Sequence, residues 1–364
     1  DLCLYIPESG NDLPDVLDEA IYGIDIYRRM QLPDGGIRGG VESAEHPAEG
    51  TTSWQEVNTV LAYAPDHWSS YIYAGVAART AIVLKMLDMQ EKAIIWEESA
   101  VKAMEWAEVE YEKWINSPEY KNVTERAKRT VPVERNLAAV ELYRLTQDKQ
   151  WHQIYLQTQE QSRNDAAFIY ARLDPSLVNK KAQKTAVDKL MAEADQIVEW
   201  SANNAFGIST GRPGRPLGGW SSTYTMPASP TLVQAHYLTG DSIYLKTILR
   251  SALYSAGANP MNLSLTTGLG ENYVKNALHE DTRHTGQPAP LGISVFGPSE
   301  LAHNVQPGSN LEIKLNAECT PKISKWPTSE SYFDIFWFVS QNEYVIDRPL
   351  GQAAYIWGYL ASRK

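Results

Sequence analysis

Basic clusters, long apolar runs and cysteine are all scarce in this 364-residue sequence. The formal net charge is −11, and no group of lysines and arginines is dense enough to neutralise a phosphate backbone. No apolar stretch reaches the roughly 18 residues that a membrane-spanning helix needs. The sequence therefore predicts that the protein neither binds nucleic acid nor spans a membrane.

Cysteine occurs only as Cys3 and Cys319. Two cysteines cannot build a dense disulfide framework, and their spacing does not decide whether they pair. The sequence begins at Asp1 without a methionine and shows no signal peptide, so we expect that upstream sequence has been removed.

Aromatic residues are abundant, with 11 tryptophans and 20 tyrosines. The apolar face of a sugar ring packs on an aromatic face, so such a surplus could line a sugar-binding cleft. Composition alone favours the simpler interpretation that these side chains fill a core. Three of them stand in loops just ahead of predicted helices and are candidates for sugar stacking, although a purely structural role is equally compatible: Tyr63, Trp68 and Trp220.

Apolar residues recur at helical spacing through most of the chain. The first segment, residues 13–31, has Pro14 in its opening turn and Asp12 as the expected N-cap. The other predicted helices cover residues 68–88, 91–114, 131–146, 149–161, 180–203, 228–239, 242–257 and 351–361, with a shorter one after Asn164. Residues 310–316 alternate apolar and polar side chains and are predicted to form a short strand.

These segments indicate an all-α protein with long loops and minor β excursions. No strand–helix alternation supports a doubly wound sheet, and no strict repeat supports a helical array. Helical hairpins without a repeat favour an (α/α)6 barrel. The segments fall about one hairpin short of that barrel, so we expect it to be incomplete, with its first helical hairpin missing.

Three motifs carry a resemblance to family 9 glycoside hydrolases, which are cellulase-type enzymes. The first is residues 6–19, IPESGNDLPDVLDE, followed by the loop Asp34-Gly35-Gly36. It is similar to the family's IPESGNGIPDILDE string, which leads into a barrel helix that ends before a DGG loop. An ordinary capped helix explains Pro14 but not the whole string.

The second motif comprises residues 257–260, GANP, residues 267–270, TGLG, and residues 278–283, LHEDTR. It resembles the family's GxNP, TGxG and PHxR region, whose histidine and arginine lie in the substrate cleft. The resemblance makes His279 and Arg283 candidate substrate-binding residues. Arg283 follows His279 by four residues instead of two, so their side chains need not occupy the usual positions, and both could be ordinary loop residues.

The third motif is residues 332–343, YFDIFWFVSQNE, followed by GQAAY at residues 351–355. It resembles the family's C-terminal signature, in which an aromatic-x-Asp precedes the catalytic Asn-Glu by a fixed interval. Asp334 and Glu343 fit that interval, although Val339 replaces an expected aromatic residue. The resemblance implies that Glu343 is the proton donor and that Asp334 shapes the subsites around the cut bond.

The chemistry of glycoside hydrolysis agrees with this assignment. A glycosidic oxygen is a poor leaving group and needs a carboxylic acid that is still protonated near neutral pH. Apolar surroundings raise the pKa of a glutamate, and aromatic residues on both sides of Glu343 offer such surroundings. In an unknown protein, a surface glutamate in a loop would be the simpler interpretation.

The second carboxylate of an inverting pair has no counterpart in the sequence. In the family it belongs to an Asp-Ala-Gly-Asp motif upstream of the first segment, and that string occurs nowhere in these 364 residues. We therefore expect residues 1–364 to form a single catalytic domain that is truncated at its N-terminus, preceded by that motif and, as in related enzymes, by an Ig-like domain. The resemblance requires no cofactor but allows structural calcium bound through loop oxygens; we assign no metal ligands.

The sequence thus predicts a secreted or periplasmic bacterial enzyme that hydrolyses β-1,4 bonds of cellulose or a related plant β-glucan with inversion. Two alternatives stay open at this point. One is an exo-acting enzyme such as a glucosaminidase or cellobiohydrolase. The other is a non-catalytic carbohydrate-binding barrel that has lost its base.

Overall fold

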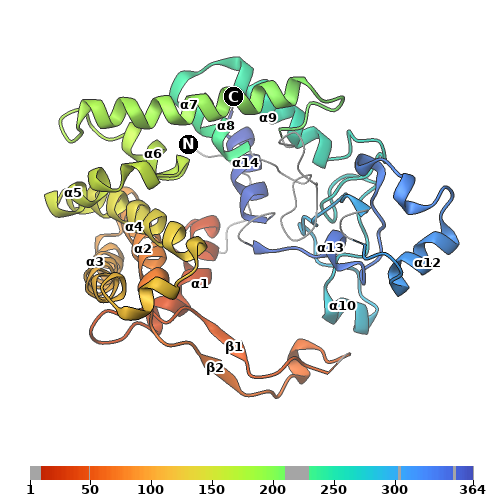
Figure 1. The fold of residues 1–364 in the computed structure, drawn as a ribbon, viewed down its shortest axis with the longest axis horizontal. Helices are drawn as coiled ribbons and strands as arrows, with labels where there is room; N and C mark the ends of the chain where they lie inside the picture. The colour runs from red at the N-terminus through yellow and green to blue at the C-terminus, as the bar shows by residue number, and fades with distance from the viewer. Residues whose placement is uncertain (1–9, 49, 210–228, 302–304, 347–349, 364) are drawn as a thin grey trace. The chain divides into compact units, whose positions relative to one another are not determined.

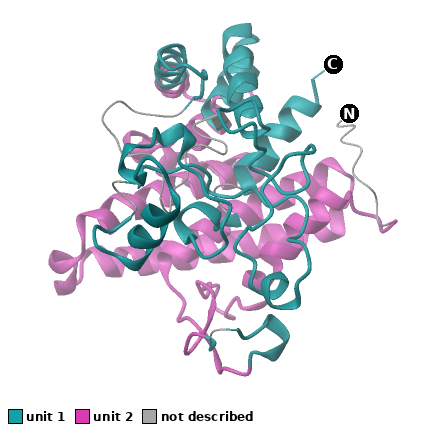
Figure 2. Cartoon of the chain, turned by 90° about the vertical axis from the view of Figure 1, so that its right-hand side faces the viewer, with its two compact units in different colours: residues 1–4, 47–56, 191–364 teal, residues 5–46, 57–190 magenta. Residues whose placement is uncertain are grey.

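The computed structural model describes residues 10–48, 50–209, 229–301, 305–346 and 350–363. Helices dominate these residues (Figure 1). The chain divides into two compact units, which are coloured separately in Figure 2. Unit 1 comprises residues 1–4, 47–56 and 191–364, and unit 2 comprises residues 5–46 and 57–190. The prediction that all 364 residues form a single domain stays a prediction.

Unit 2 is built from helical hairpins and one small two-stranded sheet. Its helices are α1 (Asp15–Arg29), α2 (His67–Met86), α3 (Gln90–Ile115), α4 (Glu125–Thr146), α5 (Lys149–Gln157), α6 (Asn164–Ala171) and the first half of α7 (Lys180–Ala202). Short 3-10 turns cover Pro118–Asn122 and Gln159–Gln161. Strands β1 (Val41–Ser43) and β2 (Val60–Ala62) pair antiparallel, with Val41 opposite Ala62.

The core of unit 2 centres on α2, which packs against both α3 and α4. Small residues on α2, such as Ala74, Ala77 and Ala81, are fully buried and let the neighbouring helices approach closely. Gly75 shows how close the approach is, because a Cβ atom there would lie only 3.4 Å from the Cα of Ala138 on α4. Larger side chains, including that of Met104, fill the space between the helices.

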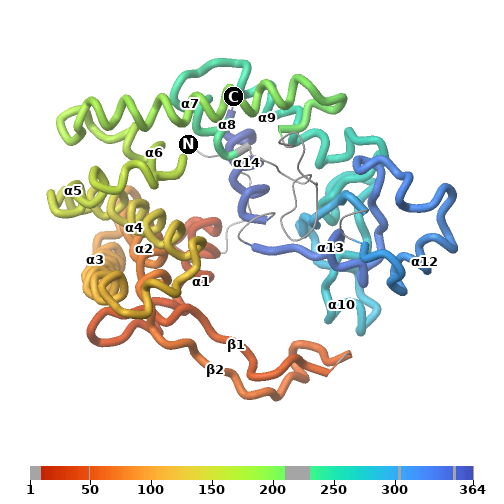
Figure 3. The backbone as a smooth tube through the Cα atoms, viewed as in Figure 1, coloured from red at the N-terminus to blue at the C-terminus, as the bar shows by residue number. Residues whose placement is uncertain are grey.

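Unit 1 combines a few helices with long loops. Its helices are the second half of α7, α8 (Ser229–Thr239), α9 (Ser242–Ser255), α10 (Glu280–Thr285), α12 (Asn310–Glu318), α13 (Val339–Asn342) and α14 (Gly351–Ala361). It also holds 3-10 turns at Ser53–Gln55, Ile323–Lys325 and Thr328–Glu330. Helices α8 and α9 form a hairpin against which α14 packs, and their backbone paths can be followed in Figure 3.

Most of the predicted helices are present, with ends that shift by a few residues. Helix α4 begins at Glu125, earlier than expected, and continues through Pro132. The predicted N-cap of α1 is wrong: the cap position is occupied by Pro14 instead of Asp12, and no side chain caps the helix there.

The predicted strand at residues 310–316 is also wrong, because this segment forms helix α12. Ser309 caps the helix by accepting the N–H of Glu312 at 3.2 Å. Leu311 and Leu315, one helical turn apart, both pack into a small core, whereas Ile313 points away and is 60% exposed. Leu311 and Leu315 are four residues apart and so lie on one face of a helix. The alternating pattern arose only because the exposed Ile313 is also apolar.

Candidate active site

The loop that leads to Glu343 is held from inside by two buried amide side chains. The Nδ2 of Asn342 donates to the carbonyls of Phe333 at 2.8 Å and Ile335 at 2.9 Å. The Oδ1 of Asn342 accepts the hydroxyl of Tyr332 at 2.5 Å. Because Asn342 is fully buried, these bonds fix the loop without competition from water.

Gln341 acts on the same loop from the other side. Its Oε1 accepts the N–H of Phe333 at 2.9 Å. Its Nε2 donates to the hydroxyl of Ser299 at 3.0 Å and to the carbonyl of Ser331. With both amides satisfied, the backbone ahead of Glu343 has little freedom.

Backbone hydrogen bonds tie the residues around Glu343 to two neighbouring loops. The carbonyl of Glu343 accepts the N–H of Phe296 at 2.9 Å, and the carbonyl of Gln341 accepts that of Gly297 at 2.9 Å. The carbonyl of Asn342 accepts the N–H of Leu278 at 2.8 Å. Hydrogen bonds to two neighbouring segments therefore fix the backbone at Glu343 and at the two residues before it.

The carboxyl group of Glu343 has few polar partners. Its Oε2 is buried and has no hydrogen-bond partner among the residues that the structure describes. Burial raises the pKa of Glu343, because the ionised form loses part of its hydration. A carboxyl group in this state keeps its proton at higher pH than an exposed glutamate and can act as an acid.

Three of the aromatic residues expected around Glu343 have other side chains as neighbours. Phe338 is buried in a core beside Phe333, with ring centroids 6.2 Å apart. Phe336 lies under the guanidinium of Arg283, and Trp337 is exposed beside Lys314. The packing of these aromatic side chains helps to fix the loop that carries Glu343.

Asp334 lies in the same unit as Glu343, and its carboxylate is engaged by backbone. Its two oxygens accept the N–H groups of Lys275 at 2.7 Å and Asn276 at 2.9 Å. The side chain of Asn276 donates in return to the carbonyl of Asp334 at 2.9 Å. Asp334 thus holds the segment before His279 against the loop of Glu343, and its predicted part in shaping the subsites stays a prediction.

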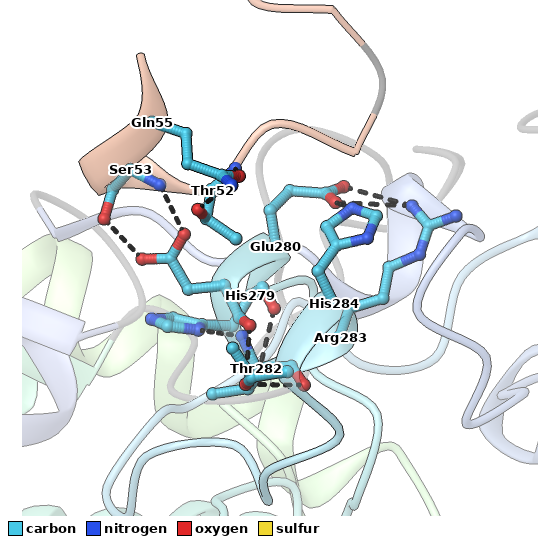
Figure 4. Close-up of polar contacts among 10 residues, drawn as sticks. Thr52, Ser53, Gln55, His279, Glu280, Thr282, Arg283 and His284 are labelled. Carbon is cyan, nitrogen blue, oxygen red and sulfur yellow. Dashed lines mark hydrogen bonds and ion pairs between the residues drawn. The ribbon is translucent and has the colours of Figure 1, made fainter.

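Arg283 lies on α10 and His279 immediately precedes this helix, which Figure 4 shows in close-up. His279 is the N-cap of this helix, and its Nδ1 accepts the N–H of Thr282 at 3.4 Å. The guanidinium of Arg283 lies 3.9 Å from the ring centroid of Phe336 and pairs with Glu280 at 3.3 Å. In this arrangement Arg283 links α10 to the loop of Glu343; direct binding of substrate by either residue stays a prediction.

Two of the other predicted binding residues do not belong to the unit that holds these four. Tyr63 and Trp68 belong to unit 2, where Tyr63 donates its hydroxyl to Glu42 and Trp68 stands exposed on the first turn of α2. Trp220 lies outside the described residues, as do residues 6–9 of the first motif.

The described part of the chain contains neither a disulfide nor a cluster of metal-binding side chains. Cys319 forms no disulfide with any described residue, and Cys3 lies outside that part. Within the described ranges, no three residues of the types His, Cys, Asp and Glu are grouped so that they could hold a metal ion. Nor is any helix of those ranges both long and apolar enough to cross a bilayer.

Two kinds of residue in this region were not predicted from the sequence. Gln341 and Asn342 hold the loop through contacts with other parts of the chain, and no local sequence pattern predicts such contacts. The same holds for Asp281, whose carboxylate accepts the N–H and the hydroxyl of Ser53, both at 2.6 Å, from a segment far away in the sequence.

A mainly helical scaffold that presents a carboxyl group with one buried oxygen and a raised pKa on a fixed aromatic loop fits the class of the glycoside hydrolases, which must protonate a leaving oxygen. Comparison with known proteins identifies the family. The chain belongs to glycosyl hydrolase family 9, whose sequence model matches residues 4–357.

Named relatives include Endoglucanase D of Acetivibrio thermocellus, which is 25% identical over 76% of this chain and 46% of its own length. A xyloglucan-specific endo-beta-1,4-glucanase of Bacteroides ovatus is 26% identical over 81% of this chain and 54% of its own length. The chain therefore spans about half the length of these two relatives.

Solved structures confirm the fold class. A metagenome-derived family 9 endoglucanase superposes with a TM-score of 0.76 at 22% identity, over 99% of this chain and 64% of the other. A family 9 protein of Bacteroides ovatus gives a TM-score of 0.75 at 20% identity. The predicted all-α class, the (α/α)6 barrel fold, is thereby confirmed.

Proposed function

We propose that this protein hydrolyses β-1,4 bonds of cellulose or a related plant β-glucan in the manner of an endoglucanase, with inversion at the anomeric carbon and Glu343 as the acid. The observation that carries the proposal is the state of the Glu343 carboxyl group: its Oε2 is buried, its pKa is raised, and the backbone that carries it is held by hydrogen bonds. Membership of family 9 and the endoglucanase relatives support the reaction type.

In the proposed reaction, Glu343 gives its proton to the glycosidic oxygen while the bond from that oxygen to the anomeric carbon breaks. A second carboxylate takes a proton from water, and the oxygen of that water forms the new bond on the opposite face of the sugar. The two carboxyl groups of an inverting enzyme stand roughly 6.5–9.5 Å apart to leave room for the water. We assign only the acid to the residues of this chain.

The proposal also covers cofactors, the place of action and the residues that bind substrate. Acid and base catalysis by two carboxyl groups needs no organic cofactor. A polymeric glucan cannot enter a cell, so we propose that the enzyme acts outside the cytoplasm. We keep structural calcium and the substrate-binding roles of His279, Arg283, Asp334, Tyr63, Trp68 and Trp220 as parts of the proposal.

Replacing Glu343 with glutamine tests the proposal, because the amide has the same shape but no acidic proton. In the full-length protein, we expect Glu343→Gln to lower kcat on carboxymethylcellulose and xyloglucan by about 100- to 10,000-fold. A dinitrophenyl β-cellobioside, whose leaving group needs no protonation, should be cleaved with a much smaller loss. The difference between the two substrates separates loss of the acid from loss of the fold.

Product stereochemistry provides an independent measurement. NMR of the first products should show the α-anomer, as inversion at a β-linkage requires. Unchanged turnover by Glu343→Gln would show that this residue is not the acid. A β-anomer as the first product would show that the enzyme retains the anomeric configuration.

A further inference from the structure

Trp54, in the 3-10 turn Ser53–Gln55 of unit 1, is a conspicuous residue to which the proposed mechanism gives no part. Its side chain is 65% exposed, whereas tryptophan is highly buried on average. We propose that Trp54 is a stacking platform for a sugar ring and forms a glucan-binding subsite away from the bond that is cut. This inference rests on the function proposed above and names a residue that determines its preference for long chains.

The turn that carries Trp54 is rigid. Thr52, which is buried, directs both its backbone N–H and its hydroxyl to the Oε1 of Gln55, at 3.2 and 2.8 Å. The N–H of Gln55 returns a bond to the carbonyl of Thr52 at 2.9 Å. The residues before and after Trp54 are therefore fixed, so that binding on its ring costs little conformational entropy.

Two further contacts attach this segment to α10, and Figure 4 shows the first of them, which Ser53 makes. Ser53 donates its N–H and its hydroxyl to the two oxygens of Asp281, both at 2.6 Å, and these bonds lower the pKa of Asp281. Gly50 lies so close to His284 that a Cβ atom there would stand 3.4 Å from the imidazole. The φ of +89° at Gly50 also favours glycine, so the backbone is shaped for this close approach.

The same helix is attached to the loop of the candidate acid. Leu278, just before α10, donates to the carbonyl of Asn342, which precedes Glu343. Arg283 covers the ring of Phe336 in that loop. Helix α10 thus connects the exposed ring of Trp54 to the backbone of Glu343 through a short path of hydrogen bonds within unit 1. A binding subsite needs such a fixed relation to the reacting group.

The chemistry of the exposed group selects the occupant. A flat indole face packs on the apolar face of a pyranose and leaves the sugar hydroxyls free to contact water. β-1,4-Glucan presents such faces along its length, and a chain held at one end by the acid can extend to a further platform. A protein partner is the competing occupant, and the test below separates the two.

Kinetics on substrates of different length test the proposal. With the full-length protein, we expect Trp54→Ala to raise KM for xyloglucan and cellohexaose by about 3- to 10-fold with little change in kcat. The effect on KM should become negligible as the substrate shortens to an aryl β-cellobioside.

Two further variants serve as controls. Trp54→Tyr should restore most of the affinity that Trp54→Ala loses. Tyr22→Ala, on α1, removes another exposed aromatic ring, at 81% exposure, and serves as the matched control that leaves every KM unchanged.

Binding measured without turnover completes the test. In a Glu343→Gln background, calorimetric titration with cellohexaose should show a Kd that Trp54→Ala raises by the same factor as KM. Asp281→Ala should raise both values in the same direction, because it releases the turn without touching the ring. An equal loss on long and short substrates, or unchanged KM and Kd, overturns the proposal and leaves a structural or protein-docking role.

The two proposals fail in different ways. If the unsubstituted protein cleaves no β-1,4-glucan, the proposed function is wrong, and the subsite falls with it. If the protein cleaves glucan but Trp54→Ala binds cellohexaose as tightly as before, only the subsite is wrong.

Discussion

Glu343, Asp281 and Asp334 are three carboxyl groups of unit 1 with different surroundings. Asp281 and Asp334 each accept two backbone or hydroxyl donors and hold segments of the chain together. The buried Oε2 of Glu343 accepts no hydrogen bond from any described residue, and burial raises the pKa of its carboxyl group. The surroundings of each carboxyl group, and not the residue type, are therefore what distinguishes the proposed acid from the two structural carboxylates.

The raised pKa of Glu343 predicts how activity and stability depend on pH. In the proposed mechanism, activity needs the protonated form of Glu343, so the alkaline limb of the kcat/KM profile should report its raised pKa. Stability follows the same group. A glutamate with a raised pKa in the folded state contributes stability below its unfolded pKa, and that contribution is lost as pH rises through the folded pKa. Glu343→Gln should therefore gain stability relative to the unsubstituted protein as pH rises.

Thermal unfolding at several pH values, together with pH–rate profiles, measures this prediction. We expect the difference in Tm between Glu343→Gln and the unsubstituted protein to grow in favour of the variant from acid to alkaline pH. Glu19→Gln, on the exposed face of α1, is the matched control for removal of one negative charge. A Tm difference for Glu343→Gln that does not change with pH, or that follows the control, contradicts the prediction.

The residue scale also shows what the sequence could predict of the site. Glu343 and Asp334 were proposed as site residues from the spacing of a family motif, which is a local signal. Gln341 and Asn342 stand in the same motif, but their anchoring role appears only when the loops they bond are folded together. The bonds between Ser53 and Asp281 join residues far apart in the chain, and no periodicity encodes such a pair.

Secondary structure was predicted well where apolar periodicity runs over many residues, as in α2, α3 and α7. It failed in α12, where the segment is short and three apolar residues at alternate positions fit two interpretations. Tertiary packing favours the helix over the strand, because Leu311 and Leu315 pack into a small core whereas Ile313 is exposed.

Helix α12 yields a prediction at the scale of a single element. In the helix, Leu315 is buried and Ile313 is 60% exposed, so their truncation should have unequal costs. We expect Leu315→Ala to lower the free energy of unfolding by about 2–5 kcal/mol. Ile313→Ala should lower it by about 0.5 kcal/mol or less.

Urea unfolding of the two variants provides the measurement. The pair forms its own control, because both substitutions remove a branched aliphatic side chain from the same segment. A strand with Leu311, Ile313 and Leu315 on one buried face would make the two losses similar, so equal losses are the result that contradicts helix α12.

At the scale of the whole molecule, helix α7 belongs to both units. Its first half contributes Ala182 to the core of unit 2. Its second half carries Asp195, which accepts the hydroxyl of Tyr244 of unit 1 at 2.7 Å. A helix shared in this way provides a physical reason to expect the two units to unfold together, as a single domain requires.

Breaking α7 near the boundary between the units tests this expectation. Ala192 is exposed, so its replacement disturbs the helix backbone with little change in packing. Proline there removes an intrahelical hydrogen bond and should cost about 3 kcal/mol, whereas Ala192→Ser should cost well under about 1 kcal/mol. If the units form one cooperative domain, Ala192→Pro should lower Tm while scanning calorimetry still shows one transition, with calorimetric and van't Hoff enthalpies that agree. Two separate transitions in the unsubstituted protein, of which the substitution moves only one, would show that the units unfold as independent domains.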